Sequence, residues 1–138
     1  MSNERLDISE RIVKFCGRII KLVNIISGTS AGKKIADQVV RCGTSIGASY
    51  EEAHGAQSRA DFAHKMQIAL KESRETRYWL CLVLEADLAP GFGVEALFDE
   101  ATKLRAILGK SVATIRKTAK PPPRVLPLSS PPQDRRTT

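Results

Sequence analysis

Two short spacings in the chain place carboxylates and a histidine where they could bind a metal ion. Glu51 and His54 lie three residues apart, and so do Glu72 and Glu75. In carboxylate-bridged di-metal bundles, two helices each supply a Glu-x-x-His pair and the other two each supply a glutamate. This sequence has one such pair, because no glutamate stands three residues before His64. The ligand set is incomplete, so we expect no metal site and no cofactor.

Cysteine catalysis is the second chemistry that the residue types allow. The chain has three cysteines, Cys16, Cys42 and Cys81. Each falls among apolar residues at helical spacing, which predicts packed, reduced thiols rather than activated nucleophiles. No serine or threonine lies in a nucleophile motif. We therefore expect a protein without catalytic residues, which is not an enzyme.

Lysine and arginine offer a third chemistry, the binding of phosphate. The chain carries 22 basic and 15 acidic residues, a net charge of +7. The excess lies in residues 1–43 and 101–138, whereas residues 44–100 are acidic overall. This distribution fits contact between the ends of the chain and nucleic acid or another polyanion. The candidate phosphate-binding residues are Arg11, Lys14, Arg18, Lys21, Lys103, Lys110, Arg116 and Lys117.

The first four of these basic residues are spaced by three, four and three positions, so they form one stripe along a helix. The same spacing also fits an ordinary solvated face, and both interpretations stay open. Aromatic residues make up 5% of the chain, which is too few for base stacking to dominate. Recognition would therefore go through the phosphate backbone.

Four amphipathic helices are needed to position these residues. Apolar side chains recur at helical spacing over residues 8–27, 31–54, 58–87 and 94–118, with turn residues between the segments. Asp7 and Ser58 each have an acidic residue three positions later, which predicts a helix N-cap at both. No alternating strand pattern competes. We predict an all-α fold, an up-down-up-down antiparallel four-helix bundle over residues 1–119.

The composition changes after this domain. Six of the seven prolines lie in residues 121–138. Such a segment buries too little apolar surface to order itself, so we predict a disordered, Pro-rich basic tail over residues 120–138. No segment has the length and hydropathy of a membrane span, and no signal peptide precedes the first helix. We expect a cytoplasmic protein without membrane contact.

Residues 41–82 carry small residues where a bundle normally has aliphatic side chains. Gly43 and Gly47 lie four residues apart within a predicted helix. Each glycine costs about 1 kcal/mol relative to alanine in a helix interior. Close approach of another helix backbone, which no Cβ would obstruct, would offset that cost.

The same stretch carries charged residues on an inner helical face. Glu72 and Glu75 share a side of the third predicted helix with Trp79. A partly buried carboxylate needs a cationic partner. The candidate partners are Arg41, Arg74 and Arg77.

This stretch also resembles a known family. The most specific parts are Ser-Ile-Gly-Ala at residues 45–48, Glu-Ala at 52–53 and Lys-Glu-x-x-Glu-x-x-x-Trp-Leu at 71–80. With the surrounding residues 41–82, they resemble the four-helix bundle protein family, also called the S23 or 23S ribosomal RNA intervening-sequence proteins. The resemblance covers about residues 8–118 and is strongest over residues 41–82.

The resemblance implies a homopentamer of four-helix subunits with no established catalytic activity. A related protein, the accessory variability protein of diversity-generating retroelements, is a basic pentameric bundle that binds nucleic acid and a reverse transcriptase. The positions that match the family motif are interpreted as structural, in helix packing, buried pairing and subunit contact. They are Arg41, Ser45, Glu52, Glu72, Glu75 and Trp79, and Gly43 and Gly47 join them through their predicted close packing.

The sequence leaves two functions open. The first is a non-enzymatic oligomeric bundle that binds RNA or DNA through basic helix faces. The second is a protein-interaction scaffold or accessory subunit, for example of a reverse transcriptase, which does not itself contact nucleic acid.

Overall fold

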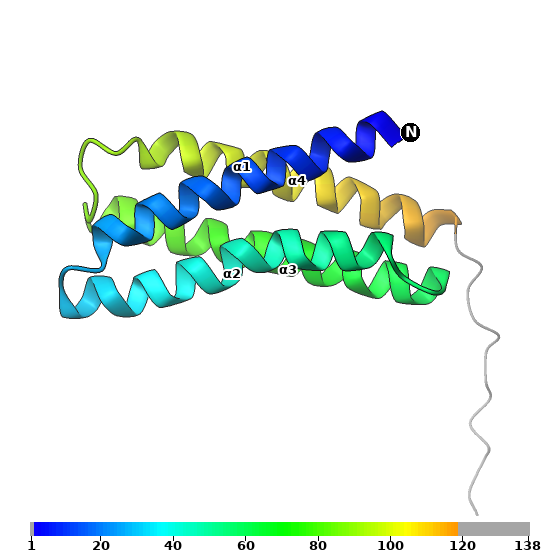
Figure 1. Cartoon of the computed structure of the whole chain (residues 1–138), viewed down its shortest axis with the longest axis horizontal. Helices are drawn as coiled ribbons and strands as arrows, with labels where there is room; N and C mark the ends of the chain where they lie inside the picture. The colour runs from blue at the N-terminus through cyan, green and yellow to red at the C-terminus, as the bar shows by residue number, and fades with distance from the viewer. Residues whose placement is uncertain (1, 119–138) are drawn as a thin grey trace, which may run out of the picture.

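Four long helices make up the part of the chain that this computed structural model describes, residues 2–118. They are α1 (Ser2–Ile26), α2 (Ser30–His54), α3 (Arg59–Glu85) and α4 (Val94–Thr118). Short connections join them, so successive helices run antiparallel around a common core (Figure 1). The predicted all-α, up-down-up-down bundle is confirmed. The predicted tail, residues 120–138, lies outside the described residues.

The observed helix bounds agree with the predicted segments except at the start of the chain. The helix α1 begins at Ser2 rather than near residue 8, so Asp7 lies inside the helix and is not its N-cap. The predicted cap at Ser58 is confirmed, because its Oγ accepts a hydrogen bond from the backbone N–H of Asp61 at 3.0 Å. Between α3 and α4, Gly91 and Gly93 adopt φ angles of 81° and 86°, a conformation that glycine takes without strain.

Aliphatic side chains from all four helices fill the core. Burying one such side chain fully contributes about 1.5–3 kcal/mol. Among the described residues, two polar side chains, Ser73 and Thr76, are also fully buried. Their hydroxyls donate to the carbonyls of Leu70 and Glu72 on their own helix, each at 2.7 Å, so neither hydroxyl is left unbonded. The largest fully buried side chains are Phe15, Ile12, Ile19, Leu22, Ile46, Met66, Leu80, Leu97, Leu104 and Leu108.

Gly43 and Gly47 allow α1 to pack closely on α2. A Cβ added to Gly43 would lie 3.1 Å from Cγ2 of Ile19, and one added to Gly47 would lie 3.2 Å from Cγ2 of Ile12. Both separations are tighter than ordinary van der Waals contact. The predicted close packing is therefore present. However, the prediction that a helix backbone fills the space is wrong, since the atoms found there are α1 side chains.

Candidate nucleic-acid interface

The basic stripe of α1 lies beside α4, and one of its members is neutralised there. Arg11 donates from Nε to Oε2 of Glu100 at 2.6 Å and from Nη2 to Oε1 at 3.1 Å. The hydrogen bond to Glu100 raises the pKa of the Arg11 guanidinium. A two-point pair of this kind is among the stronger hydrogen-bonded contacts. Arg11 thus has a partner inside the protein, which makes it the weakest of the predicted phosphate contacts on α1.

The other basic residues of this stripe join those of α4 on one surface. Lys14 lies three residues from Arg11, and Lys103 lies three residues from Glu100, so both share the side of the bundle where that pair sits. Lys110 and Lys117 continue from Lys103 at seven-residue spacing. We call this surface the α1–α4 face and define it by Lys14, Arg18, Lys21, Lys103, Lys110 and Lys117.

The side chains of the α1–α4 face are accessible. Arg18 is half-buried and the five lysines are exposed. Within residues 7–118, none of the six forms an ion pair with a carboxylate. The last predicted contact, Arg116, is exposed in the final turn of α4. The structure therefore places most of the residues that the charge pattern indicated along one pair of helices, with those of α1 and those of the second half of α4 toward opposite ends.

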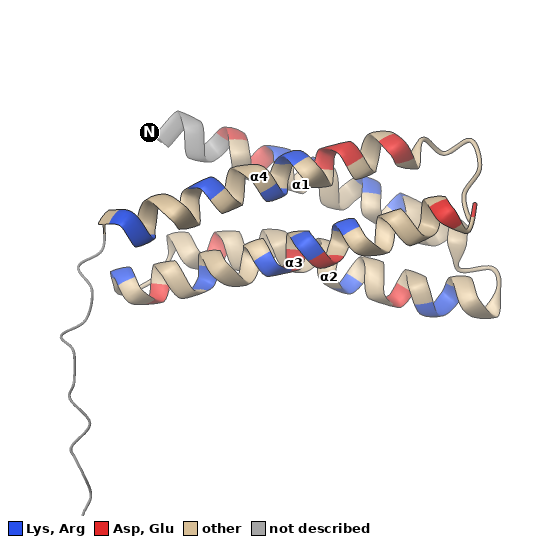
Figure 2. Ribbon diagram, turned by 180° about the vertical axis from the view of Figure 1, so that it is seen from behind, with Lys and Arg blue, Asp and Glu red and all other residues tan. Residues whose placement is uncertain are grey.

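Acidic segments interrupt this face. Because α1 and α4 run antiparallel, the basic half of each helix lies beside the acidic start of the other. Figure 2 shows this for α4, whose first turns are acidic and whose last turns are basic. At the far end of the face, Asp7 and Lys110 line the same hollow, of about 590 Å³. The positive potential is thus weaker than the charge of the separate segments indicates.

The α2–α3 seam contains the predicted structural residues. Arg41 donates from Nη2 to Oε2 of Glu75, and its Nη1 lies 3.7 Å from Oε1 of Glu72. Trp79 donates from Nε1 to the same Glu75 oxygen at 3.3 Å. We define the α2–α3 seam by these four residues. The hydrogen bond to Glu75 raises the pKa of Arg41. Of the three candidate partners of the two glutamates, Arg41 is the one that pairs with them, and Oε1 of Glu72 makes no hydrogen bond within the described residues.

Two other predicted structural positions behave differently from each other. Ser45 donates to the carbonyl of Arg41 at 2.7 Å, which places it one turn from the seam. Glu52 is exposed near the end of α2 and contacts none of the seam residues. Its role in subunit contact stays a prediction.

The α3–α4 seam holds charged residues that the sequence reasoning assigned wrongly or passed over. Arg77, a predicted partner of the glutamates, instead donates from Nε to Oγ1 of Thr102 at 2.7 Å. Its guanidinium lies 4.8 Å from the centre of the Phe98 ring. Arg105 lies one turn beyond Thr102 on α4. We define the α3–α4 seam by Arg77, Phe98, Thr102 and Arg105. Arg74, the third predicted partner, is exposed and pairs with neither glutamate.

Within the described residues, the two arginines of the α3–α4 seam lack a carboxylate partner. In the described part of the chain, no ion pair involves Arg77 or Arg105. The Nε of Arg105 is buried and has no hydrogen-bond partner there. A sequence signal for this cluster existed in retrospect, since Phe98, Thr102 and Arg105 recur at helical spacing.

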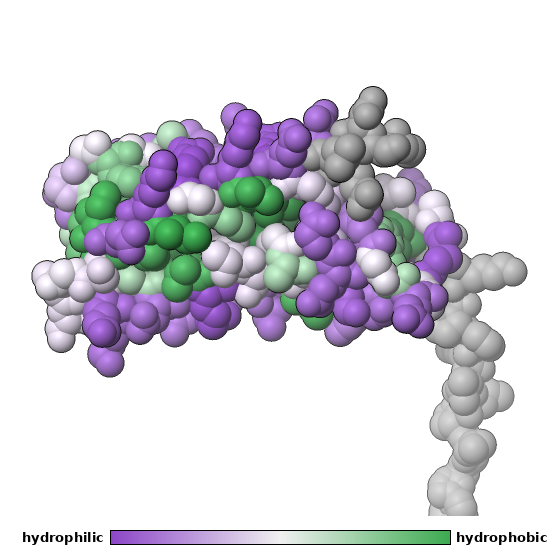
Figure 3. Space-filling view, in the orientation of Figure 1, coloured by the Kyte–Doolittle hydropathy of each residue, from purple (hydrophilic) through white to green (hydrophobic). Residues whose placement is uncertain are grey.

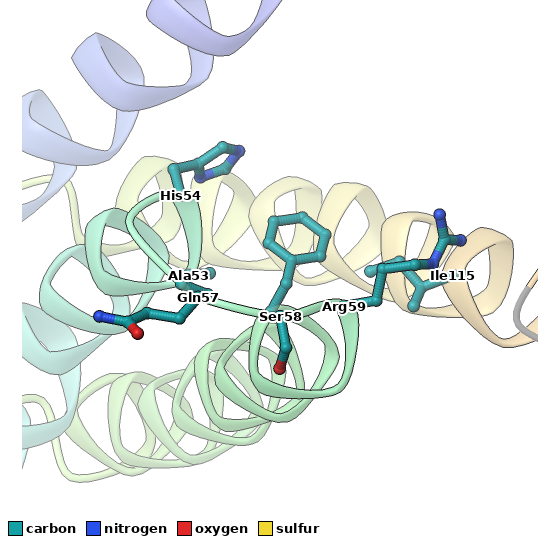
Figure 4. A pocket seen from close by; sticks show the side chains of 8 residues that line it. Ala53, His54, Gln57, Ser58, Arg59 and Ile115 are labelled. Atoms are coloured by element: carbon teal, nitrogen blue, oxygen red, sulfur yellow. The ribbon is translucent and has the colours of Figure 1, made fainter. Parts of the chain in front are cut away.

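The possible metal ligands are engaged elsewhere. Glu51 accepts a hydrogen bond from Ser9 at 2.7 Å, and the Nδ1 of His54 lies 3.0 Å from the carbonyl oxygen of Tyr50. His54 lines a hollow of about 380 Å³ at the turn between α2 and α3, opposite Ile115 of α4 (Figure 4). Among the described residues, no group of three or more His, Cys, Asp and Glu side chains could hold a metal ion.

The three thiols differ in their surroundings. Burial raises the pKa of Cys42 and that of Cys16, as expected for packed thiols. Cys81 is exposed. The prediction that all three cysteines are packed among apolar residues is therefore wrong for Cys81, because this position of α3 faces away from the core of the bundle.

Comparison with known proteins supports the resemblance that residues 41–82 indicated. The family model described as 23S rRNA-intervening sequence protein matches residues 4–110. A crystal structure of a protein of unknown function from the S23 ribosomal protein family of Bacteroides thetaiotaomicron VPI-5482 is 33% identical, with a TM-score of 0.72. The match covers 79% of this chain and 97% of that chain. The comparison with curated proteins finds no match.

Proposed function

The chain belongs to the 23S rRNA-intervening sequence protein family, and from this premise we propose that it is a non-enzymatic bundle that binds RNA or DNA. The observation that carries the proposal is the α1–α4 face. Five exposed lysines and one half-buried arginine lie along these two helices, and within residues 7–118 none of them forms an ion pair with a carboxylate. Exposed lysines bind phosphate as point charges, which gives affinity without sequence readout.

We propose that the bundle acts as an assembly of several copies, a homopentamer by family resemblance. Large apolar side chains exposed on α1 support contact with another copy: Val13 is 67% exposed, Ile20 46% and Ile25 53%. Figure 3 shows hydrophobic residues on the surface formed by α1 and α2. Repetition of the α1–α4 face in an assembly would multiply weak phosphate contacts. None of the described helices is long and apolar enough to cross a membrane, and we place the assembly in the cytoplasm.

A salt titration with a fluorescein-labelled RNA duplex tests the proposal. Binding should weaken steeply with salt, because each neutralised phosphate contributes about 0.9 to the slope of log K against log salt. The combined change Lys14→Glu, Arg18→Glu and Lys21→Glu should weaken binding at least about tenfold at low salt. Arg11 is left unchanged, because a glutamate there would face Glu100 and disturb the fold.

The control for this variant is Lys33→Glu with Lys34→Glu. These two lysines are exposed at the start of α2, outside the α1–α4 face, so their reversal should weaken binding much less. If the wild-type protein fails to bind RNA or DNA at low salt, the proposal is wrong. Equal losses in the two variants would mean that net charge, rather than this face, determines the affinity.

The second candidate function is a protein-interaction scaffold. The exposed apolar side chains of α1 and the 59% exposed Tyr78 of α3 favour it, because such residues gather where proteins meet. Affinity capture from nuclease-treated extract separates the two functions. A defined partner that stays bound without nucleic acid supports the scaffold, and the loss of all partners after nuclease supports nucleic-acid binding.

A further inference from the structure

Two pairs of arginines in this bundle differ in their partners. Arg11 and Arg41 each have carboxylate partners on a neighbouring helix. Arg77 and Arg105 are half-buried and have none within the described residues. Removing a guanidinium from water is costly unless a counter-charge and hydrogen-bond acceptors replace the water. The α3–α4 seam therefore presents two positive charges whose compensation the described part of the chain does not supply.

The geometry of Arg77 prepares it to bind an anion. Thr102 holds its Nε, and the Phe98 ring lies beneath its guanidinium. The Thr102 hydroxyl also donates to the carbonyl of Phe98 at 3.0 Å, so both of its roles are taken and it positions Arg77 rather than a ligand. The two Nη groups of Arg77 make no hydrogen bond within the described chain. A planar, pre-positioned guanidinium fork of this kind matches the oxygens of a phosphate.

Arg105 supplies a second guanidinium, which lies one turn beyond Thr102 on α4. Its buried Nε–H has no acceptor in the described part of the chain. Arg105 lies one turn from Thr102 along α4, so this donor would reach an anion held at Arg77 only after a side-chain movement that exposes it. The anion would then supply the hydrogen bond that the protein leaves unmade.

We infer that Arg77 and Arg105 form a phosphate-binding site, which takes a backbone phosphate of the nucleic acid. The inference rests on the proposed function. Arg74 is exposed three residues before Arg77, so it lies on the same side of α3 and can contact a neighbouring phosphate. The site is separate from the α1–α4 face, because Thr102 contacts α3 whereas Glu100 contacts α1. A polyanion would thus engage α4 from both sides.

The variants Arg105→Gln and Arg105→Lys, in the full chain, test this site with the same RNA duplex. Loss of one phosphate contact should lower the slope of log K against log salt by about 0.9 for each subunit that engages the RNA. The affinity of Arg105→Gln should fall about fivefold at low salt, and Arg105→Lys should restore part of it. The matched control is Lys71→Gln, an exposed position of α3 outside the site. Circular dichroism should show an unchanged fold in all three variants.

A second measurement does not depend on nucleic acid. The Nε–H resonance of Arg105, followed by nitrogen-15 NMR, should shift on addition of inorganic phosphate and should not shift with chloride at equal ionic strength. If RNA binds the wild-type protein and Arg105→Gln equally well, with the same salt slope, the site is not a backbone contact, while the proposed function stands. If RNA does not bind but phosphate shifts the resonance, the proposed function fails and the site takes a free phosphate group. If neither ligand acts, both proposals are wrong.

Discussion

The two seams that flank α3 both contain arginines, but the arginines have different partners in each. In the α2–α3 seam, Arg41 contacts two glutamates, and Trp79 adds a hydrogen bond to one of them. In the α3–α4 seam, Arg77 has an aromatic ring and a hydroxyl as neighbours, and Arg105 has no hydrogen-bond partner for its Nε within the described residues. The arginine on one side of α3 has two carboxylates beside it, although Oε1 of Glu72 makes no hydrogen bond within the described residues, whereas the arginines on the other side have none there. The difference indicates that the first seam joins helices and that the second can accept a ligand.

The largest change in stability should come from a substitution of Glu75 in the α2–α3 seam. The change Glu75→Gln removes the charge that Arg41 and Trp79 share, and we expect a loss of about 1 kcal/mol in the free energy of unfolding. Trp79 is the only tryptophan of the chain, so its fluorescence should report the altered contact directly. Urea unfolding measures the stability. The control Glu52→Gln, at an exposed position outside the seam, should change stability by less than about 0.5 kcal/mol; equal losses would show that the seam has no special role.

The stability of the protein should also depend on pH, because Cys42 is buried between the helices of the bundle. Burial raises the pKa of Cys42 above its ordinary value. When the pH rises past about 8.5, the thiol ionises in the unfolded chain but stays protonated in the folded one. The unfolded state is then favoured, so stability should fall as the pH rises through this range. Cys16 is buried in the same way and contributes with the same sign.

Chemical unfolding at pH 7.5 and pH 10 measures this effect, and the variant Cys42→Ala should show a smaller decrease than the wild-type protein. Labelling with a thiol reagent at neutral pH should modify the exposed Cys81 first. Rapid labelling of Cys42 in the native protein would mean that α2 and α3 separate readily.

The smallest change in stability should come from the α3–α4 seam, and it should be an increase rather than a decrease. The change Arg105→Met keeps the apolar stem and removes a buried N–H that has no acceptor within the described residues. We therefore expect unfolding to become harder by up to about 0.5 kcal/mol, or to stay unchanged. Thermal unfolding without phosphate in the buffer checks this. A clear destabilisation would reveal a partner for Arg105 and would remove the contrast between the two seams.

The fold and one of the two seams could be predicted from local patterns. Apolar spacing and turn residues located the four helices, and the spacing of Glu72 and Glu75 on one helical face required a cation, which Arg41 supplies. Such inferences need only the period of the helix and the cost of burying charge.

The other contacts depend on which helix lies beside which. The sequence gives no sign that Arg11 meets Glu100, a residue 89 positions away. Arg77 was one of three candidate partners for the glutamates, but its position turns toward α4 and Phe98. The acidic segment beside each basic segment of the α1–α4 face was missed for the same reason. A count of charges along the chain does not show that the antiparallel arrangement places acidic residues of one helix beside basic residues of the other.

The two glycines of α2 also determine the axial register of α1. The side chains of Ile12 and Ile19 lie against Gly47 and Gly43, where any Cβ would crowd them. If α1 slid by one helical turn, about 5.4 Å, one isoleucine would face the other glycine, but the second isoleucine would meet a residue that carries a side chain. The Arg11–Glu100 pair forms in the observed register, because its 2.6 Å hydrogen bond tolerates no such shift. Two positions without side chains on α2 thereby align the charges of α1 with those of α4, a helix that neither glycine contacts.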